Sequence, residues 1–197
     1  FIHRAIEDID SRNLTFLNKK GITKKPTYVA ELKIDGLKII LTYRSGKLVR
    51  AATRGDGEVG EDVTLNVKTI GSIPLSLKKD LDITVVGEVW MKKNDLERIN
   101  KERIRLGEAP YANTRNLAAG TLRQLDPKTV AKRHLQFFAY DIEVGKGETM
   151  YASQKEELAA LTDFGFMVNK DGKVCRTLLE VQSFYDAWTP KRQGENY

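Results

Sequence analysis

The sequence predicts an α+β fold in which antiparallel sheets are flanked by helices. Helical and extended patterns mix irregularly along the 197 residues, without the strand–helix–strand repeat of a parallel sheet. Arg44-Ser45-Gly46 lies between two extended apolar runs, which is typical of a hairpin between antiparallel strands. With 41% hydrophobic and 30% charged residues, the chain has the composition of a globular domain with a core.

The first half of the chain is expected to hold one long helix and several strands. Ile2, Ile6 and Ile9 keep helical spacing in residues 2–19, and Gly21 ends that helix. Residues 28–53 read as strand, turn and strand, followed by a glycine-rich acidic loop at 54–62. A short helix at 62–70 and a strand at 82–91 complete this half.

The second half is expected to be mainly helical, with one aromatic-rich strand at 135–143. Asn94 is predicted to cap a helix that ends at Gly107. A further helix is predicted at 113–125, stopped by Asp126-Pro127. Ser153 with Glu156, and Thr177 with Glu180, have the spacing of capping boxes and predict two more helix starts.

The hexapeptide Glu31-Leu32-Lys33-Ile34-Asp35-Gly36 carries the strongest functional signal. It lies between apolar runs and is predicted to be a strand, on which Glu31, Lys33 and Asp35 share one face. A lysine between two carboxylates suits a pocket where a deprotonated lysine is a nucleophile and Asp35 orients its amine. The alternative is a solvated face with two local ion pairs.

Charge and cysteine content narrow the partners and the compartment. The net charge of +6 favours polyanions such as nucleic acid or nucleotides. Cys175 is the single cysteine, so a disulfide within the chain is excluded, no zinc cluster of cysteines is expected, and a reducing interior suits the chain. Because no apolar run is long enough to span a bilayer and no secretory signal opens the chain, a cytoplasmic protein without membrane contact is expected.

Two further segments suggest contacts to a phosphorylated ligand. Arg54 opens the loop Arg54-Gly55-Asp56-Gly57, where glycines allow close approach and the arginine can pair with phosphate; the alternative is a flexible surface loop. On a helix, Arg115 and Arg123 stand eight residues apart on one face, beside small residues. The alternative for these two is a solvated basic stripe.

Glu88 and Tyr140 are the remaining candidates for contacts to a ligand. Glu88 lies inside an apolar strand and needs a partner, which can be a ribose hydroxyl, a metal ion held through water, or a core cation. Tyr140 ends an aromatic run and can stack on a nucleobase or pack in the core.

These stretches together resemble the adenylation domain of bacterial-type NAD-dependent DNA ligases. The hexapeptide alone fits all covalent nucleotidyltransferases, whereas residues 53–64 and 112–126 are similar to signatures of the NAD class. The resemblance extends from about Tyr28 to Asp141, and more loosely to the end. It implies a nucleotidyltransferase fold, of ATP-grasp-like type, and a role in DNA replication and in the repair of DNA damage.

The resemblance also implies residue roles. Lys33 takes AMP from NAD as lysyl-AMP, Glu31 reads the adenine amino group, Tyr140 stacks on adenine and Glu88 binds the ribose. The matching arginines handle the nucleotide or the 5′-phosphate of a DNA nick: Arg54, Arg115 and Arg192 for the nucleotide, Arg115 and Arg123 for the nick. Magnesium is implied because charge builds on the phosphate during transfer.

Four positions depart from the pattern of that family: Leu32 and Thr114 replace frequent prolines, Lys38 a small residue, and Val86 an arginine. Strand alternation predicts that Lys38 lies on the face opposite Lys33, unless Gly36 breaks the register.

The resemblance also predicts the extent of the domain. Residues 1–20 are expected to be the remnant of an N-terminal helical segment, and 21–197 an adenylation domain that is incomplete at its C-terminal end. We therefore expect a monomeric piece of a ligase that binds adenosine but has weak or no activity by itself. A non-catalytic nucleic-acid-binding module and an ATP-dependent relative are the competing interpretations.

Overall fold

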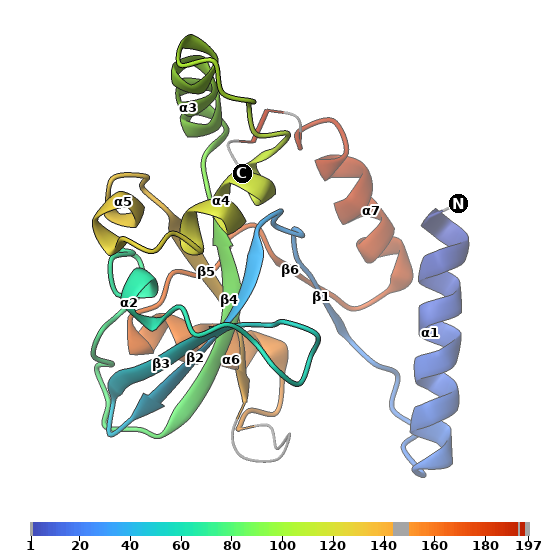
Figure 1. Ribbon diagram of the computed structural model, residues 1–197. Helices are drawn as coiled ribbons and strands as arrows, with labels where there is room; N and C mark the ends of the chain where they lie inside the picture. Colours follow the sequence, from blue (N-terminus) through green and yellow to red (C-terminus); the bar gives the residue numbers. More distant parts are fainter. Residues whose placement is uncertain (1, 144–149, 193, 196–197) are drawn as a thin grey trace. The chain divides into compact units, whose positions relative to one another are not determined.

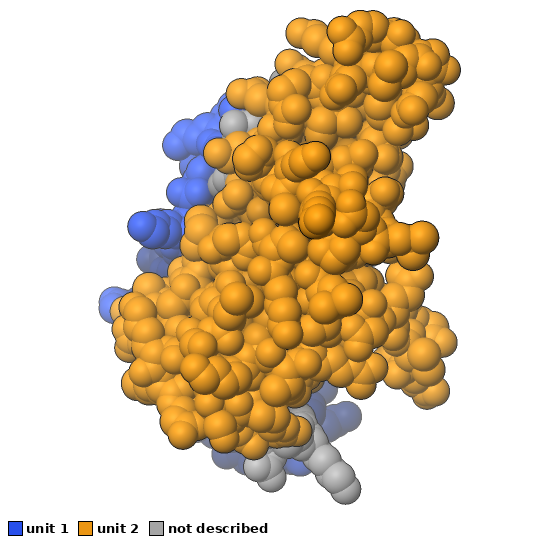
Figure 2. Space-filling model, turned by 60° about the vertical axis from the view of Figure 1, so that its left-hand side comes forward, with its two compact units in different colours: residues 1–32, 170–195 blue, residues 33–169, 196–197 orange. Residues whose placement is uncertain are grey.

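A computed structural model describes residues 2–143, 150–192 and 194–195 (Figure 1). The chain divides into two compact units, coloured separately in Figure 2. Unit 1 consists of Phe1–Leu32 and Lys170–Glu195, and unit 2 of Lys33–Asn169 with Asn196–Tyr197. The boundary therefore falls inside the predicted lysine hexapeptide, between Leu32 and Lys33.

Unit 2 is built on a four-stranded antiparallel sheet in the order β3-β2-β4-β5. Its strands are β2 (Leu37–Arg44), β3 (Lys47–Thr53), β4 (Ile83–Trp90) and β5 (Gln136–Glu143). The predicted hairpin is confirmed, with Arg44 paired to Lys47 at the end of the ladder, so that Ser45 and Gly46 form a two-residue turn in which both have positive φ.

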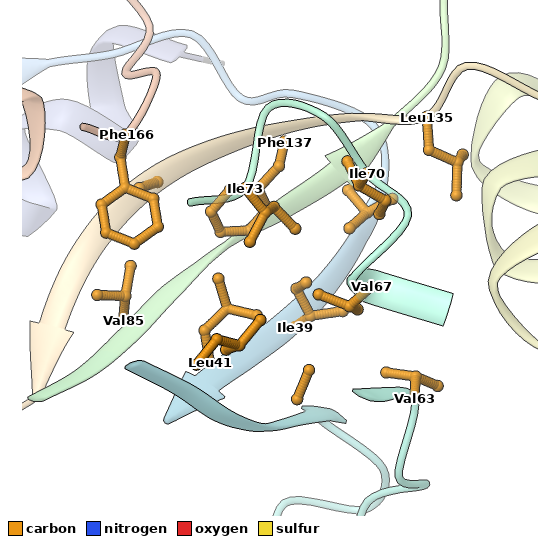
Figure 3. Packing of buried hydrophobic residues seen from close by; sticks show 14 of the residues in the cluster. Ile39, Leu41, Val63, Val67, Ile70, Ile73, Val85, Leu135, Phe137 and Phe166 are labelled. Atoms are coloured by element: carbon orange, nitrogen blue, oxygen red, sulfur yellow. The ribbon is translucent and has the colours of Figure 1, made fainter. Parts of the chain in front are cut away.

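One face of this sheet carries the hydrophobic core. Ile39, Leu41, Val85 and Phe137 project from it toward the segment after β3, which supplies Val63, Val67, Ile70 and Ile73 (Figure 3). The unit's helices are α2 (Thr64–Val67), α3 (Lys93–Arg105), α4 (Thr114–Leu122), α5 (Pro127–Ala131) and α6 (Gln154–Phe164). Each of them adds at least one buried side chain to this core. On the opposite face of the sheet, Glu88 lies across from Phe138, whose ring stacks on that of Trp90 with the ring centroids 5.1 Å apart.

Unit 1 pairs two helices with a small sheet. α1 (Ile2–Lys19) contacts α7 (Leu178–Trp188), and β1 (Tyr28–Ala30) pairs antiparallel with β6 (Lys173–Cys175). The predicted helix at 2–19 and the helix start at Thr177 are confirmed, and the Thr177 side chain accepts a hydrogen bond from the Glu180 amide. Strand β6 was not expected from the sequence.

Four predicted details are wrong. Residues 31–36 are not a strand, because the chain passes here from the sheet of β1 to that of β2. The N-cap position of helix α3 is Lys92, whose side chain makes no capping hydrogen bond, and Asn94 lies inside the helix. Helix α4 ends at Leu122 rather than 125, and Asp126-Pro127 starts α5 instead of only stopping a helix, since proline suits a first helical turn.

Within the described ranges, no helix is long and apolar enough to cross a membrane.

Candidate active site

Lys33 and Asp35 lie in the irregular segment that enters β2. Both are exposed, whereas Ile34 between them is buried, so the predicted alternation persists without a strand ladder. The Asp35 carboxylate is 3.8 Å from the Arg115 guanidinium at the start of α4. The Lys33 amine is therefore open to an incoming ligand, not buried.

Gly36 fixes this segment against β4. A Cβ at this position would lie 2.2 Å from the carbonyl oxygen of Val89 and 2.8 Å from Cγ of Glu88. Only glycine allows the segment to pass so close to the strand. The segment that carries Lys33 and Asp35 is thereby held close to Glu88.

Glu88, half-buried on β4, connects these groups electrostatically. Burial raises the pKa of its carboxyl group, while the charges of Lys33 and Arg115 and a hydrogen bond from the Gly36 backbone lower it. The charge of Asp35 acts in the opposite direction to those cations. Lys33, Asp35 and Arg115 thus all lie within electrostatic range of one carboxylate.

The strand register shows what surrounds Glu88 on its face of the sheet. Lys38 of β2 and Phe138 of β5 are its direct cross-strand partners. Directly opposed residues project to the same face, so Lys38 stands beside Glu88. The condition attached to the prediction for Lys38 is met: residues 31–36 are not part of the β2 strand, so alternation cannot be counted from Lys33 through Gly36 to Lys38.

Tyr140 joins this face through an irregularity in β5. Val86 pairs with Asp141 and Gly87 with Ala139, which leaves Tyr140 as the extra residue of a bulge. Burial, helped by the charges of Glu88 and Asp141, raises the pKa of the Tyr140 hydroxyl to about 12, against an opposing effect of Arg54. The hydroxyl is therefore neutral at pH 7, and Arg54, Glu88 and Tyr140 share one electrostatic environment.

The glycine-rich loop after β3 is exposed, and hydrogen bonds within the loop define its shape. The Asp56 carboxylate accepts hydrogen bonds from the amides of Glu58 and Val59, which lowers its pKa. Gly55 has a φ of +55°, and a Cβ there would lie 1.7 Å from the Val59 carbonyl oxygen. This glycine therefore serves to close the loop, and the loop holds Arg54 at the end of β3.

Arg123 lies apart from Arg115. It follows the end of α4 and forms an ion pair with Glu61 at 2.7 Å. Eight residues of helix separate the two arginines by roughly 12 Å. Arg123 lines a hollow of about 390 Å³ together with residues such as Asn66 and Leu125. The two arginines therefore belong to different places on the surface of unit 2, Arg115 near Asp35 and Arg123 at this hollow.

Glu31 and Arg192 belong to unit 1. Burial raises the pKa of the Glu31 carboxyl group, and Gly172 lies beside its side chain, where a Cβ would be 3.4 Å from Cγ of Glu31. Arg192 follows α7 and is exposed. Their predicted contacts to a nucleotide stay predictions.

The residues gathered in unit 2 fit a nucleotide. Lys33, Arg54 and Arg115 can balance phosphate charge, Glu88 can accept hydrogen bonds from ribose hydroxyls, and the half-buried Tyr140 ring suits a base. No cluster of three or more histidine, cysteine or acidic side chains suitable for a metal occurs in the described residues. Magnesium held by one carboxylate and by ligand phosphates needs no such cluster, and Glu88 stays the candidate.

Comparison with known proteins assigns the chain to a family. The family model of the NAD-dependent DNA ligase adenylation domain matches residues 3–197. The chain belongs to this family. A DNA ligase of Natranaerobius thermophilus is 52% identical over 170 residues, which are 85% of this chain and 25% of the relative.

Other ligases match this adenylation domain over more of its length. DNA ligases of Brevibacillus brevis and Shouchella clausii are 48% identical over 192 residues and 42% identical over 196 residues. These matches cover 98% and 100% of this chain, but only 28% and 29% of the relatives. The adenylation domain thus spans a little over a quarter of the length of the ligases it matches.

Proposed function

We propose that the chain is the self-adenylating module of a DNA ligase and that Lys33 is its nucleophile. The observation that carries the proposal is the environment of Glu88. This half-buried carboxylate lies within electrostatic range of Lys33 and Arg115, on the sheet face shared with Tyr140. Adenylate transfer needs an amine nucleophile, a cation for the phosphate, an acceptor for the ribose hydroxyls and an aromatic ring for the base in one place.

In the proposed reaction, the deprotonated Lys33 amine attacks the α-phosphorus of NAD. The Nζ–P bond forms and the P–O bond to nicotinamide mononucleotide breaks. One of the two protons on the attacking amine is lost to solvent. Arg54 and Arg115 balance the charge that develops on the phosphate, while Asp35, held near Arg115, orients the amine. Magnesium, when bound, would add to this charge stabilisation.

The remaining contacts fix the adenosine. Glu88 accepts from the ribose hydroxyls, Tyr140 stacks on adenine, and Glu31 reads the adenine amino group. Arg192 adds a further contact to the nucleotide.

The parent enzyme would then pass AMP to the 5′-phosphate of nicked duplex DNA, bound by Arg115 and Arg123, and the 3′-hydroxyl would close the nick. Because the chain spans so little of its relatives, sealing is proposed for the full-length enzyme only. The isolated chain is expected to bind adenosine with weak or no self-adenylation. We propose further that the parent enzyme is cytoplasmic and monomeric and that it acts in DNA replication and repair.

Intact-protein mass spectrometry of the full-length parent tests it. Incubation with NAD should add one AMP, and Lys33→Ala should abolish the gain. No gain with NAD in the wild-type parent would favour a non-catalytic nucleic-acid-binding module. A gain with ATP but not with NAD would favour an ATP-dependent enzyme.

A further inference from the structure

We propose that the Lys38 ammonium group binds a phosphate of the nucleotide, as a second lysine of the adenylation site. The inference rests on the proposed function, since it assumes that a nucleotide occupies the sheet face around Glu88. The family resemblance gives Lys38 no role, because a small residue is usual at that position.

The strand register places Lys38 in the middle of the candidate site. It is the direct cross-strand partner of Glu88, and such pairs have Cβ atoms about 4.5–5.5 Å apart. On its other side, the next residue of β2, Ile39, pairs with Thr53, the last residue of β3 and the chain neighbour of Arg54. Lys38 therefore lies directly across from the ribose-binding candidate, in the part of β2 that faces the end of β3.

The electrostatic contacts across the sheet point to the same region. Arg54 follows an edge strand and Tyr140 lies on the opposite edge strand, yet Arg54 affects the pKa of the Tyr140 hydroxyl. The space between them lies above β2 and β4, where Lys38 and Glu88 project. The charge of Lys33 also affects the pKa of Glu88, so a phosphate attacked by Lys33 would lie close to this space.

Lys38 has a charge available for such a ligand. It is half-buried, and no salt bridge to it occurs among the residues that the structure describes. The cations that lower the pKa of Glu88 are Lys33 and Arg115. A partly desolvated ammonium without an ion-pair partner gains most from an anion that enters with the ligand.

The covalent step increases the need for this cation. When Lys33 forms its bond to phosphorus, its ammonium charge disappears and the negatively charged phosphate stays attached. Lys38 does not react and keeps its charge beside the adduct. It is therefore suited to bind the phosphate both before and after transfer.

Calorimetric titration of the full-length parent with AMP and with adenosine tests the proposal. The parent is first freed of covalent AMP with nicotinamide mononucleotide. Lys38→Met removes the charge and keeps an unbranched stem, Lys38→Arg keeps the charge, and Lys155→Met removes an exposed lysine from α6 as a matched control. Adenosine lacks the phosphate, so its affinity also reports whether each variant keeps a folded site.

We expect Lys38→Met to weaken AMP binding about ten-fold, with adenosine binding unchanged. Lys38→Arg and Lys155→Met should bind both ligands like the wild type. Unchanged AMP affinity in Lys38→Met would overturn this inference and leave the proposed function standing, as would an equal loss for both ligands. Failure of the wild-type parent to bind either ligand would overturn both proposals.

Discussion

At the scale of single residues, the ionised Glu88 side chain costs stability, while in the proposed site the same charge would bind the ribose. Burial raises its pKa although two cations oppose the shift. Between the unfolded and folded pKa values the native state binds more protons than the unfolded chain, so ionisation of Glu88 costs stability as the pH rises through that window. Such a carboxylate is expected where a ligand, not the fold, needs the charge.

We therefore expect Glu88→Gln to melt at a higher temperature than the wild type at pH 7. The difference should shrink as the pH falls through the folded-state pKa and close below the unfolded-state pKa, because the wild-type carboxyl group is then neutral in both states. Adenosine affinity should fall about ten-fold, since a charged hydrogen bond to the ribose is lost. Thermal melts across pH and calorimetry measure both effects, and a variant less stable than the wild type at pH 7 would contradict the role of burial.

Gly36 supports the second residue-scale prediction. Gly36→Ala should destabilise the protein by about 1–3 kcal/mol, because its Cβ would overlap the Val89 carbonyl group. Gly71 is the matched control, since a Cβ there would meet nothing within 4 Å. Urea unfolding compares Gly36→Ala with Gly71→Ala, and equal stabilities would show that the close approach at Gly36 is not required.

At the scale of elements, helix α4 holds Arg115 through its N-terminal cap. The Asn113 side chain, one residue before the first helical residue, accepts a hydrogen bond at 2.7 Å from the backbone amide of Asn116 in the first turn. Thr114 is the first helical residue, a position that also suits proline, so its departure from the family pattern leaves the helix start intact.

Removal of this cap should affect stability and function together. Asn113→Ala should cost about 1 kcal/mol of unfolding free energy and also slow AMP transfer, because the Arg115 end of the helix frays. Ser153→Ala removes the corresponding cap of α6 and should cost a similar free energy without slowing transfer. Urea unfolding and adduct formation rates of the full-length parent separate the two; equal rates in both variants would contradict the role of α4.

Elements with strong local signals could be predicted from the sequence, and those set by tertiary pairing could not. The helix at 2–19 and the helices after Ser153 and Thr177 are confirmed because apolar spacing and capping residues are local. Strand β6 was missed because its three residues are extended through pairing with β1.

The face on which Lys38 lies could not be decided from the sequence for a related reason. Cross-strand register depends on where β2 begins, and the break at Gly36 cannot be read from alternation alone. The candidate residues around Glu88 could each be identified from the sequence. That they lie near one another follows only from the sheet order β3-β2-β4-β5, which the sequence does not reveal.

At the scale of the whole molecule, the two faces of the unit 2 sheet carry different groups of residues. One face holds the core shown in Figure 3, and the other holds Glu88 and its neighbours. Substitution of the half-buried Lys38 on the second face should therefore change ligand binding more than folding. The net charge of +6 agrees with a polyanionic partner for the parent.

The isolated 197-residue chain should bind AMP but seal no nicked DNA. It spans 25–29% of the ligases it matches, so the proposed sealing reaction needs the rest of the enzyme. A gel assay on a nicked duplex, run with the chain and with its full-length parent, checks this. Sealing by the isolated chain would contradict the expected division.

The central claim is that AMP becomes attached to the amine of Lys33. Tandem mass spectrometry of proteolytic peptides from the full-length parent, after incubation with NAD, tests it most directly. The account predicts one AMP on the peptide that contains Lys33, located on that side chain and absent from Lys33→Ala. AMP on another lysine, such as Lys38, with Lys33 unmodified, would contradict it.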